Sequence, residues 1–365
     1  MNAQEILKQM VEKGVSDIFI ITGRPISYKQ GNVISNFDDN TFSPQDTQDF
    51  IREIYELAEN RSGSTLVETG DDDFSFAIKG VSRFRANAYR QRGTFAAVIR
   101  VVSFDMPDPD ALHIPADVSR LAELSRGLVL ITGPAGSGKT TTLATIIDHI
   151  NKTRNAHVIT LENPIEFLHR HNKSLVTQRE IDIDTTSYAR ALRAALRQSP
   201  NVILIGEMRD AETIATAITA AETGHLVLST LHTNGATNTI DRLVDSFPAE
   251  QQNQIRMQLS MVLQAVVSQQ LIPSEQGDMI PAFEIMLANA AVRNLIRDGR
   301  THQIPAVISS SGEEGMIGMD ASLLKLYETG TISFQNMIKY ALQPDALEKL
   351  AVSRHNNKDD IADRL

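Results

Sequence analysis

The apolar residues follow different patterns in the two parts of the chain. In residues 1–103, a short amphipathic stretch precedes the candidate strand Asp17–Ile21, and Ser43-Pro44 supplies the cap and first turn of a helix expected to run to about Asn60. From Asp73 to Val102, apolar and polar residues alternate with the period of two that is typical of half-buried strands. The pattern predicts a mixed α+β domain with an antiparallel sheet over residues 1–103.

Beyond this region, short apolar runs alternate with helical patterns. We expect strands at Leu128–Ile131, Ala156–Leu161, Val202–Ile205 and Leu226–Thr230, and helices near Ser119–Ser125 and at Tyr188–Arg197 and Ala211–Glu222. Buried strands that alternate with helices indicate a mostly parallel sheet, which binds ligands at the carboxyl ends of its strands. From Thr237 onward the pattern is mostly that of helices. The expected fold class is therefore α/β, with a linker at residues 104–118 and a second domain over residues 119–365.

One glycine-rich segment lies between the strand at Leu128–Ile131 and a helical pattern. It consists of Gly133, Pro134, Ala135, Gly136, Ser137, Gly138, Lys139, Thr140 and Thr141. The glycines let successive backbone N–H groups point at one spot, and the following helix adds the partial positive charge of its N-terminus. Lys139 can contact the outer phosphates, and the Thr140 hydroxyl can ligate magnesium. The segment predicts a P-loop that binds a nucleoside triphosphate together with Mg²⁺.

The remaining sequence favours ATP over GTP. A GTPase would carry an Asn-Lys-x-Asp segment that contacts the base. The nearest match, Asn172-Lys173-Ser174-Leu175, lacks the aspartate, so adenine is the expected base.

Two glutamates follow predicted strands directly. Glu207 comes just after Val202–Ile205 and stands where a P-loop enzyme has an acid that supports magnesium, and Glu162 ends the strand at Ala156–Leu161. Either carboxylate could polarise the attacking water, and the sequence leaves this assignment open. Each could also be an acid at a helix start, stabilised by the helix dipole. Their coincidence at two strand ends near the P-loop favours a functional role.

Two histidines and two arginines are further candidates. His225 and His232 flank the strand at Leu226–Thr230. A single histidine is most often a structural hydrogen-bonding group, and no cysteine or third clustered ligand supports a metal site, so the functional interpretation is a sensor of the γ-phosphate. Arg193 and Arg197 share one face of a predicted helix, either as surface charges or as cations presented across a subunit boundary.

The predicted strands of the first domain carry a concentration of basic residues. Lys79, Arg83, Arg85, Arg90, Arg92 and Arg100 lie close together in the sequence, with Phe84 and Tyr89 among them. This pattern is compatible with nucleic-acid contact through a basic, aromatic pair of strands. It is equally compatible with arginines that reach phosphates bound by a neighbouring subunit, or with a solvated, charged face. The residues alone leave these three interpretations open.

Composition narrows the classes of function. The 365 residues are 42% hydrophobic and 22% charged, which is ordinary for a globular protein. The sequence shows neither an apolar run of about eighteen residues, as a membrane-spanning helix needs, nor the pattern of a secretory signal at Met1–Ile6, so we expect a cytoplasmic protein. The absence of cysteine excludes disulfides and thiolate metal sites, and the net charge of −10 argues against broad nucleic-acid binding.

Four segments, in this order, resemble the motifs of the secretion/type IV pilus ATPase family. Gly133–Thr141 resembles its Walker A motif, Ile159–Phe167 its Asp box, Gly206–Asp210 its Walker B motif and Thr223–Thr233 its His box. The resemblance covers nearly the whole chain and is most specific in the second half. Further on, Ala291–Asp298 is similar to a motif of the branch that drives pilus retraction. The absence of a tetracysteine zinc motif and of a longer N-terminal region also favours that branch.

The resemblance implies a fold, an assembly and a set of site residues. It implies an N-terminal PAS-like domain flexibly joined to a RecA-like P-loop ATPase domain with a helical C-terminal part, assembled as a homohexamer with nucleotide between the two domains. The family's acids correspond to Glu162 and Glu207, and its histidines to His225 and His232. Its arginines that enter in trans correspond to Arg85, Arg100, Arg193 and Arg197.

The resemblance also implies a task and partners. The chain would hydrolyse ATP to power type IV pilus retraction and twitching motility. It would work at the inner face of the cytoplasmic membrane on an integral-membrane, PilC-like platform protein, with no nucleic-acid partner. The alternatives are an accessory retraction ATPase, a type II/IV secretion-type ATPase, and a RecA-like nucleic-acid translocase that uses the basic strands.

The sequence departs from the family pattern at three places. Asn163 stands where the family usually has an aspartate, which removes a charge beside Glu162. Val292 and Asp298 replace an isoleucine and a glutamate, which are mild changes. The strand Asp17–Ile21 departs from the usual Asp-Leu-His-Leu pattern, which leaves the contacts of the first domain open.

Overall fold

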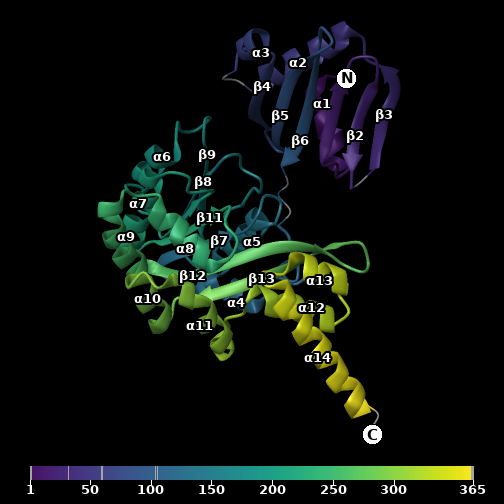
Figure 1. Ribbon diagram of the computed structural model, residues 1–365. Helices are drawn as coiled ribbons and strands as arrows, with labels where there is room; N and C mark the ends of the chain where they lie inside the picture. Colours follow the sequence, from purple (N-terminus) through teal and green to yellow (C-terminus); the bar gives the residue numbers. More distant parts are fainter. Residues whose placement is uncertain (1, 32, 59–60, 103, 105, 363–365) are drawn as a thin grey trace. The chain divides into compact units, whose positions relative to one another are not determined.

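The computed structural model describes residues 2–31, 33–58, 61–102, 104 and 106–362. The chain divides into two compact units (Figure 1). The N-terminal unit is formed by Met1–Asp105 together with Ile165–His169, and the C-terminal unit by Met106–Pro164 together with Arg170–Leu365. The predicted helix end near Asn60 and the proposed boundary at Ser103 lie outside the described residues.

The N-terminal unit is a six-stranded antiparallel sheet of order β3-β2-β1-β6-β5-β4. Its strands are β1 (Asp17–Ile21), β2 (Pro25–Gln30), β3 (Val33–Thr41), β4 (Asp71–Ile78), β5 (Ser82–Gln91) and β6 (Thr94–Val102), and its helices are α1 (Ala3–Glu12), α2 (Pro44–Leu57) and α3 (Ser64–Thr69). The helices bury apolar residues such as Leu7 and Ile54 against one face of the sheet, where they join Phe84 and Ile99. The predicted α+β domain is therefore present.

Two helices of this unit, α1 and α2, begin at local capping signals that can be recognised in the sequence. The Asn2 side chain accepts a hydrogen bond from the Glu5 backbone, and the Ser43 side chain accepts one from Asp46, so both helices begin in a capping box. β2 and β3 had not been predicted. β3 is an edge strand whose residues are exposed or only partly buried, so it has no apolar face to produce an alternating pattern.

The C-terminal unit is built on a seven-stranded sheet of order β13-β12-β7-β11-β10-β8-β9. Its strands are β7 (Gly127–Thr132), β8 (His157–Glu162), β9 (Leu175–Glu180), β10 (Val202–Ile205), β11 (Leu226–Leu231), β12 (Leu263–Pro273) and β13 (Met279–Leu287). All neighbouring strands are parallel except β12 and β13, which form an antiparallel pair. The predicted mostly parallel sheet is confirmed.

Helices cover both faces of this sheet. They are α4 (Ala116–Ser119), α5 (Lys139–Thr153), α6 (Tyr188–Ala195), α7 (Ala211–Glu222), α8 (Ala236–Asp245), α9 (Ala249–Val262), α10 (Ala290–Arg297), α11 (Ile304–Ser310), α12 (Met319–Glu328), α13 (Phe334–Tyr340) and α14 (Pro344–Ala362), with short 3₁₀ turns at Arg120–Glu123, Thr301–Gln303 and Gly312–Glu314. The helix expected near Ser119–Ser125 is instead the pair formed by α4 and the turn at Arg120–Glu123.

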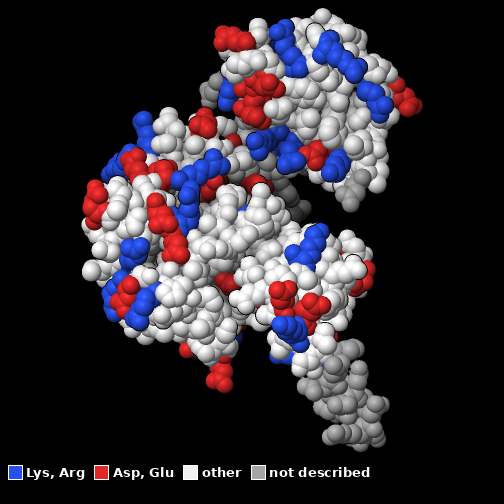
Figure 2. Space-filling model, viewed as in Figure 1, with Lys and Arg blue, Asp and Glu red and all other residues white. Residues whose placement is uncertain are grey.

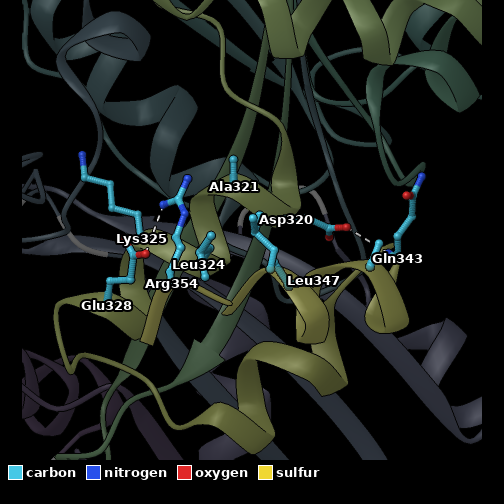
Figure 3. A pocket seen from close by; sticks show the side chains of 10 residues that line it. Asp320, Ala321, Leu324, Lys325, Glu328, Gln343, Leu347 and Arg354 are labelled. Carbon is cyan, nitrogen blue, oxygen red and sulfur yellow. Dashed lines mark hydrogen bonds and ion pairs between the residues drawn. The ribbon is translucent and has the colours of Figure 1, made fainter. Parts of the chain in front are cut away.

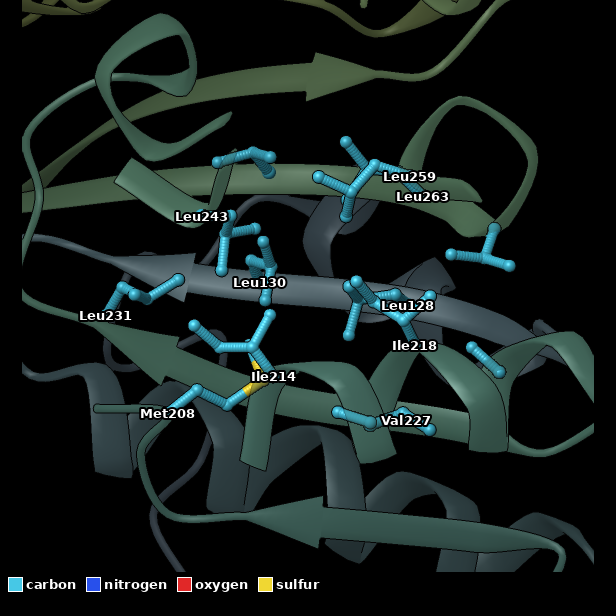
Figure 4. Close-up of a cluster of buried hydrophobic side chains, with 14 of the residues drawn as sticks. Leu128, Leu130, Met208, Ile214, Ile218, Val227, Leu231, Leu243, Leu259 and Leu263 are labelled. Carbon is cyan, nitrogen blue, oxygen red and sulfur yellow. The ribbon is translucent and has the colours of Figure 1, made fainter. Parts of the chain in front are cut away.

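The central strands are buried on both faces, which explains their unbroken apolar sequences. Leu128 and Leu130 of β7 face a cluster that includes Ile214 of α7 and Leu259 of α9 (Figure 4). The alternate residues Val129 and Ile131 face the opposite cluster, which includes Ile146 of α5. Alternate residues of β7 therefore pack against helices on opposite faces of the sheet.

The prediction of mostly helical structure beyond Thr237 is wrong for the hairpin formed by β12 and β13. β12 pairs in parallel with β7, next to the strand that precedes the P-loop. Most residues of β12 are buried. Its sequence contains three glutamines, Gln264, Gln269 and Gln270. These glutamines interrupt the apolar run, so its pattern fits a helix as well as a strand, and the neighbouring strand decides the outcome.

The last helices form a smaller core beside this hairpin, around Leu323, Leu324 and Met337. A surface pocket of about 480 Å³ lies between α12 and α14, with Leu324 and Leu347 at its floor and Asp320 and Arg354 among the charged residues lining it (Figure 3). No residue of the P-loop or of the acidic strand ends lines it. Across the described part of the chain, helices with the length and apolar character required to cross a bilayer are absent.

Candidate active site

The P-loop connects the end of β7 at Thr132 to the start of α5 at Lys139. Gly133, Gly136 and Gly138 have φ angles of 140°, 76° and 86°, which a residue with a side chain rarely adopts. A Cβ at Gly133 would also lie 2.1 Å from the backbone oxygen of Gln269. The loop thus depends on glycine both for its dihedral angles and for its close packing against β12.

The polar groups of the loop fit a bound anion. Lys139 is 7% exposed, and its Nζ donates hydrogen bonds to the backbone oxygens of Gly133 at 2.9 Å and of Pro134 at 2.8 Å. Within the described structure, the buried Ser137 Oγ has no hydrogen-bond partner. A buried hydroxyl without a partner is costly, and a phosphate oxygen would supply one. The loop has the cation, the free donor and the helix N-terminus that a phosphate group requires.

Gln269 supports the loop from the neighbouring strand. It is 3% exposed, and its Oε1 accepts a hydrogen bond from Thr142 Oγ1 at 2.8 Å. A Cβ at Gly138 would lie 2.9 Å from its Nε2. Gln269 therefore holds the first turn of α5 to β12. Sequence reasoning missed it because the strand that carries it was not predicted.

The strand register brings the two acidic candidates and His232 to the same edge as the P-loop. Leu231 of β11 is level with Thr132 of β7, and Ile205 of β10 is level with Leu161 of β8. The residues that follow these strands include Glu207 and His232, and Glu162 is the last residue of β8. Parallel strands end at one edge of a sheet, so this grouping is a direct result of the fold.

His232 lies between the P-loop lysine and Glu207. Its Nδ1 is 3.5 Å from Lys139 Nζ, and its Nε2 is 3.7 Å from Glu207 Oε2. Arg209 Nε is 2.6 Å from the same Glu207 oxygen, and the Glu207 side chain is only 13% exposed. The three predicted groups thus form a continuous polar row, with Arg209 as an additional cation at its end.

Glu162 is held in place by its own strand and by β9. It is 7% exposed, and its Oε1 accepts hydrogen bonds from Thr160 Oγ1 at 2.6 Å and from Gln178 Nε2 at 3.2 Å. The neighbouring Asn163 donates from Nδ2 to Asp182 Oδ2 at 3.4 Å. A carboxylate therefore lies beside Asn163, although position 163 itself is neutral.

Three predicted site residues lie elsewhere in the C-terminal unit. His225 precedes β11, at the opposite end of the strand from His232, and its Nδ1 is 2.9 Å from the backbone oxygen of Ala220. Arg193 is exposed and pairs with Glu212, and Arg197 is exposed just beyond the end of α6. Within one chain the structure does not bring these residues to the P-loop edge, so their roles stay predictions.

Arg85 and Arg100 lie next to each other on the open face of the N-terminal sheet. They are paired in register on β5 and β6, and with Asp17 and Asp73 they line a shallow pocket of about 220 Å³. Arg100 Nε is 2.9 Å from Asp17 Oδ1, and Arg85 is 3.9 Å from Asp73. Phe84, which precedes Arg85 in sequence, is buried on the other face and is not available for stacking on a base.

The charged side chains around this face are of mixed sign. Figure 2 shows acidic side chains lying next to basic ones on the visible surface of the N-terminal unit. Arg85 and Arg100 form a local cationic site with its own counter-ions, Asp73 and Asp17.

Comparisons with known proteins identify the family. Residues 96–318, more than half of the chain, match the family model described as Type II/IV secretion system protein. The chain is 41% identical to the type IV pilus retraction ATPase PilT of Pseudomonas aeruginosa, with 94% of this chain and 99% of the relative covered. It is 37% identical to the type IV pilus ATPase PilU of the same organism, with 93% and 89% covered.

Solved structures agree with this assignment. A crystal structure of the pilus retraction motor PilT with bound ADP superimposes with a TM-score of 0.86 at 43% identity, covering 96% of this chain and 99% of that one. The ATPase DotB of Legionella pneumophila superimposes with a TM-score of 0.78 at 28% identity, covering 92% and 95%. The chain belongs to the type II/IV secretion ATPase family, and it is an ATPase of the PilT kind. The fold expected from the resemblance is confirmed.

The contact between Gln269 and the P-loop generates a testable prediction. Replacing Gln269 with Ala removes the partner of the buried Thr142 hydroxyl and the packing behind Gly138, so the loop should hold phosphate less firmly. We expect the Kd for ADP, measured with a fluorescent analogue, to rise by about 3- to 10-fold. Gln270→Ala is the matched control because Gln270 is only partly buried and is the next residue of the same strand. Equal affinities for the two variants would contradict the role of Gln269.

Proposed function

We propose that this chain is a motor that hydrolyses ATP to power the retraction of type IV pili. The observation that carries the proposal is the 41% identity to PilT over 94% of the chain, together with the polar row of Lys139, His232 and Glu207. A relative from Neisseria gonorrhoeae named twitching motility protein is 49% identical over 72% of this chain. Twitching motility is therefore the expected cellular role.

The P-loop would bind the phosphates of ATP. The PilT structure with bound ADP supports nucleotide binding by this chain. Among the described residues no group of three or more His, Cys, Asp or Glu side chains could hold a metal by itself. Mg²⁺ would therefore be bound by the Thr140 hydroxyl and the phosphates, with Glu207 in support, as magnesium in phosphate sites usually keeps few protein ligands.

The base would occupy an apolar pocket beside the P-loop. This pocket of about 330 Å³ is lined by Thr141 at the start of α5, by His113 and Ile114 before α4, and by Leu271 and Ile280 of the β12–β13 hairpin. Its walls are mostly apolar, and it opens next to Gly138. A flat purine fits such a site, and its identity as adenine rests on the sequence argument.

Hydrolysis would use the row of polar groups at the strand ends. Glu207 or Glu162 would orient and polarise the attacking water, and Lys139 would stabilise the charge that develops on the phosphate oxygens. His232 is in reach of both Lys139 and Glu207, so it can transmit the presence of the γ-phosphate from one to the other. The chemistry requires little more than positioning and charge.

The arginines would complete the site in an oligomer. We infer a homohexamer in which arginines of one subunit approach the nucleotide bound by its neighbour. These arginines are Arg85, Arg100, Arg193 and Arg197. Arg85 and Arg100 are paired with carboxylates and Arg193 with Glu212, so each could exchange its partner for a phosphate. Changes in the bound nucleotide would then move whole domains, which is how a domain-closure switch produces mechanical work.

The motor would act at the cytoplasmic face of the inner membrane. Its partner would be the integral-membrane platform protein of the pilus machine, a PilC-like protein, with no nucleic acid involved. The similarity to the type IV pilus ATPase PilU is compatible with one alternative, an accessory retraction ATPase. Deletion of the gene, followed by measurement of twitching and of surface pili, distinguishes the two: loss of retraction supports the main motor, and weakened retraction supports the accessory one.

The P-loop assignment predicts that Lys139→Ala abolishes turnover. The loop then loses the ammonium group that lies against Gly133 and Pro134, so the transferring phosphoryl group loses its main cation. We expect a loss of kcat of about 100-fold or more in a phosphate-release assay. Lys152→Ala, in the last turn of the same helix, is the control and should turn over normally. Activity of Lys139→Ala close to that of the unmodified protein would refute the assignment.

The role of Glu207 predicts a separation of binding from chemistry. Glu207→Gln keeps the size of the side chain but cannot polarise water as a carboxylate does, so ATP should bind while kcat falls by about 100-fold or more. Binding is measured by equilibrium titration with an ATP analogue, and turnover by phosphate release. Glu250→Gln, at an exposed position at the start of α9, is the control. A normal kcat in Glu207→Gln would make Glu207 a structural residue.

The assignment of Arg85 and Arg100 to a neighbouring nucleotide predicts dominant inhibition. A variant with both arginines changed to Ala, mixed with unmodified chains, should lower ATPase activity more than simple dilution does, because each variant subunit also disables its neighbour. The measurement is activity against the fraction of variant chains. Lys79→Ala, at an exposed position in the turn between β4 and β5, is the control. A strictly proportional decrease would argue for a role within one chain.

A further inference from the structure

Tyr188 places a hydroxyl group at the acidic edge of the sheet. It is the first residue of α6, whose start is capped by the Ser187 side chain. Its side chain packs against the buried cluster that includes Leu161 of β8 and Ile205 of β10. None of the predicted functional roles includes this residue.

The hydroxyl fits a notch at Gly206. A Cβ built on Gly206 would lie 2.8 Å from Tyr188 Oη, which would be its nearest neighbouring atom. Gly206 is not among the glycines with positive φ, so its backbone conformation does not require glycine. The lack of a side chain at position 206 therefore serves to admit the phenol.

The notch lies between the two candidate acids. Gly206 N donates a hydrogen bond to the Leu161 backbone oxygen at 2.7 Å, and Glu162 follows Leu161 while Glu207 follows Gly206. A Cβ at Gly206 would also lie 3.4 Å from Glu162 Cα. The Tyr188 hydroxyl therefore lies beside the backbone that carries both acids, and the charges of both act on it.

The surroundings of Tyr188 oppose the ionisation of its hydroxyl, which is protonated at neutral pH even at its ordinary pKa. Burial raises the pKa of Tyr188 far above its ordinary value, and the charges of Glu207, Glu162 and Asp182 raise it further, against a smaller opposite effect of Arg209. Toward ionised carboxylates, which only accept hydrogen bonds, a neutral phenol acts as a donor. Such a donor favours a carboxylate in its ionised form and limits its orientation.

We propose that Tyr188 is a positioning residue for hydrolysis: seated in the Gly206 notch, its hydroxyl donates its one hydrogen bond to a water, and that water donates one hydrogen bond to each carboxylate of Glu162 and Glu207, which fixes them for hydrolysis. This role rests on the proposed function, since it concerns the hydrolytic step. It leaves ATP binding to the P-loop, because no residue of that loop contributes to the notch.

The experiment measures kcat, KM and nucleotide affinity for three variants. Tyr188→Phe removes only the hydroxyl, so kcat should fall by about 5- to 20-fold while KM and the Kd for an ATP analogue stay within about twofold. Tyr327→Phe, which removes a hydroxyl from α12 in the same unit, is the control and should leave all three unchanged. A merely structural role of Tyr188 would change affinity and thermal stability together with kcat.

The notch itself is tested by combining two changes. Gly206→Ala should lower kcat in the unmodified background because the new methyl group displaces the hydroxyl. In the Tyr188→Phe background the same change should cost at most about twofold more, because the 2.8 Å contact no longer exists and the next one, with the Leu161 oxygen, is at 3.2 Å. Effects that multiply, or a kcat of Tyr188→Phe within twofold of the unmodified protein, would overturn the proposal. Absent ATP turnover in the unmodified protein would instead overturn the proposed function itself, and with it this role.

Discussion

The constraint on which the C-terminal unit depends is the parallel alignment of β7, β11, β10 and β8. The carboxyl ends of parallel strands lie at one edge of their sheet. Here each of the four strands has a candidate functional group at or just after its carboxyl end. The P-loop follows β7, His232 follows β11, Glu207 follows β10, and Glu162 ends β8. The 3.5 and 3.7 Å contacts of His232 with Lys139 and Glu207 are the direct product of this register. The buried apolar layers on both faces of the strands hold that register fixed.

The same constraint explains how much of the site could be predicted from the sequence. The P-loop, Glu162, Glu207 and His232 could be found because each stands at a fixed offset from an apolar strand, which is a local signal. Gln269 and Tyr188 could not, because what makes them important is a contact with a residue more than fifteen positions away. Gln269 also lies on a strand whose glutamines conceal its periodicity, so its pairing with β7 decided the structure. For the N-terminal unit, α1, α2 and the strands β1, β4, β5 and β6 were predictable, whereas β2 and the exposed edge strand β3 were not.

Gln269 and Tyr188, the two residues that the sequence did not reveal, each pack closely against a glycine of a predicted motif. Gly133 admits the backbone of Gln269 behind the P-loop, and Gly206 admits the hydroxyl of Tyr188 between the acids. In both places a strand or helix outside the predicted motifs approaches a motif glycine so closely that no side chain would fit. The motifs therefore include positions whose residue type is determined by their supports and not by the ligand.

The neutral residue at position 163 is best understood in the same terms. Without its own charge, Asn163 donates to Asp182, which brings a carboxylate to within 3.4 Å of the residue that follows Glu162. Asp182 also belongs to the charges that oppose the ionisation of the Tyr188 phenol. The negative charge absent from position 163 is thus supplied from the loop after β9. Because Glu162 and Asp182 both act on the Tyr188 hydroxyl, the two carboxylates share one electrostatic environment, and a negative charge remains close to Glu162 although position 163 is neutral.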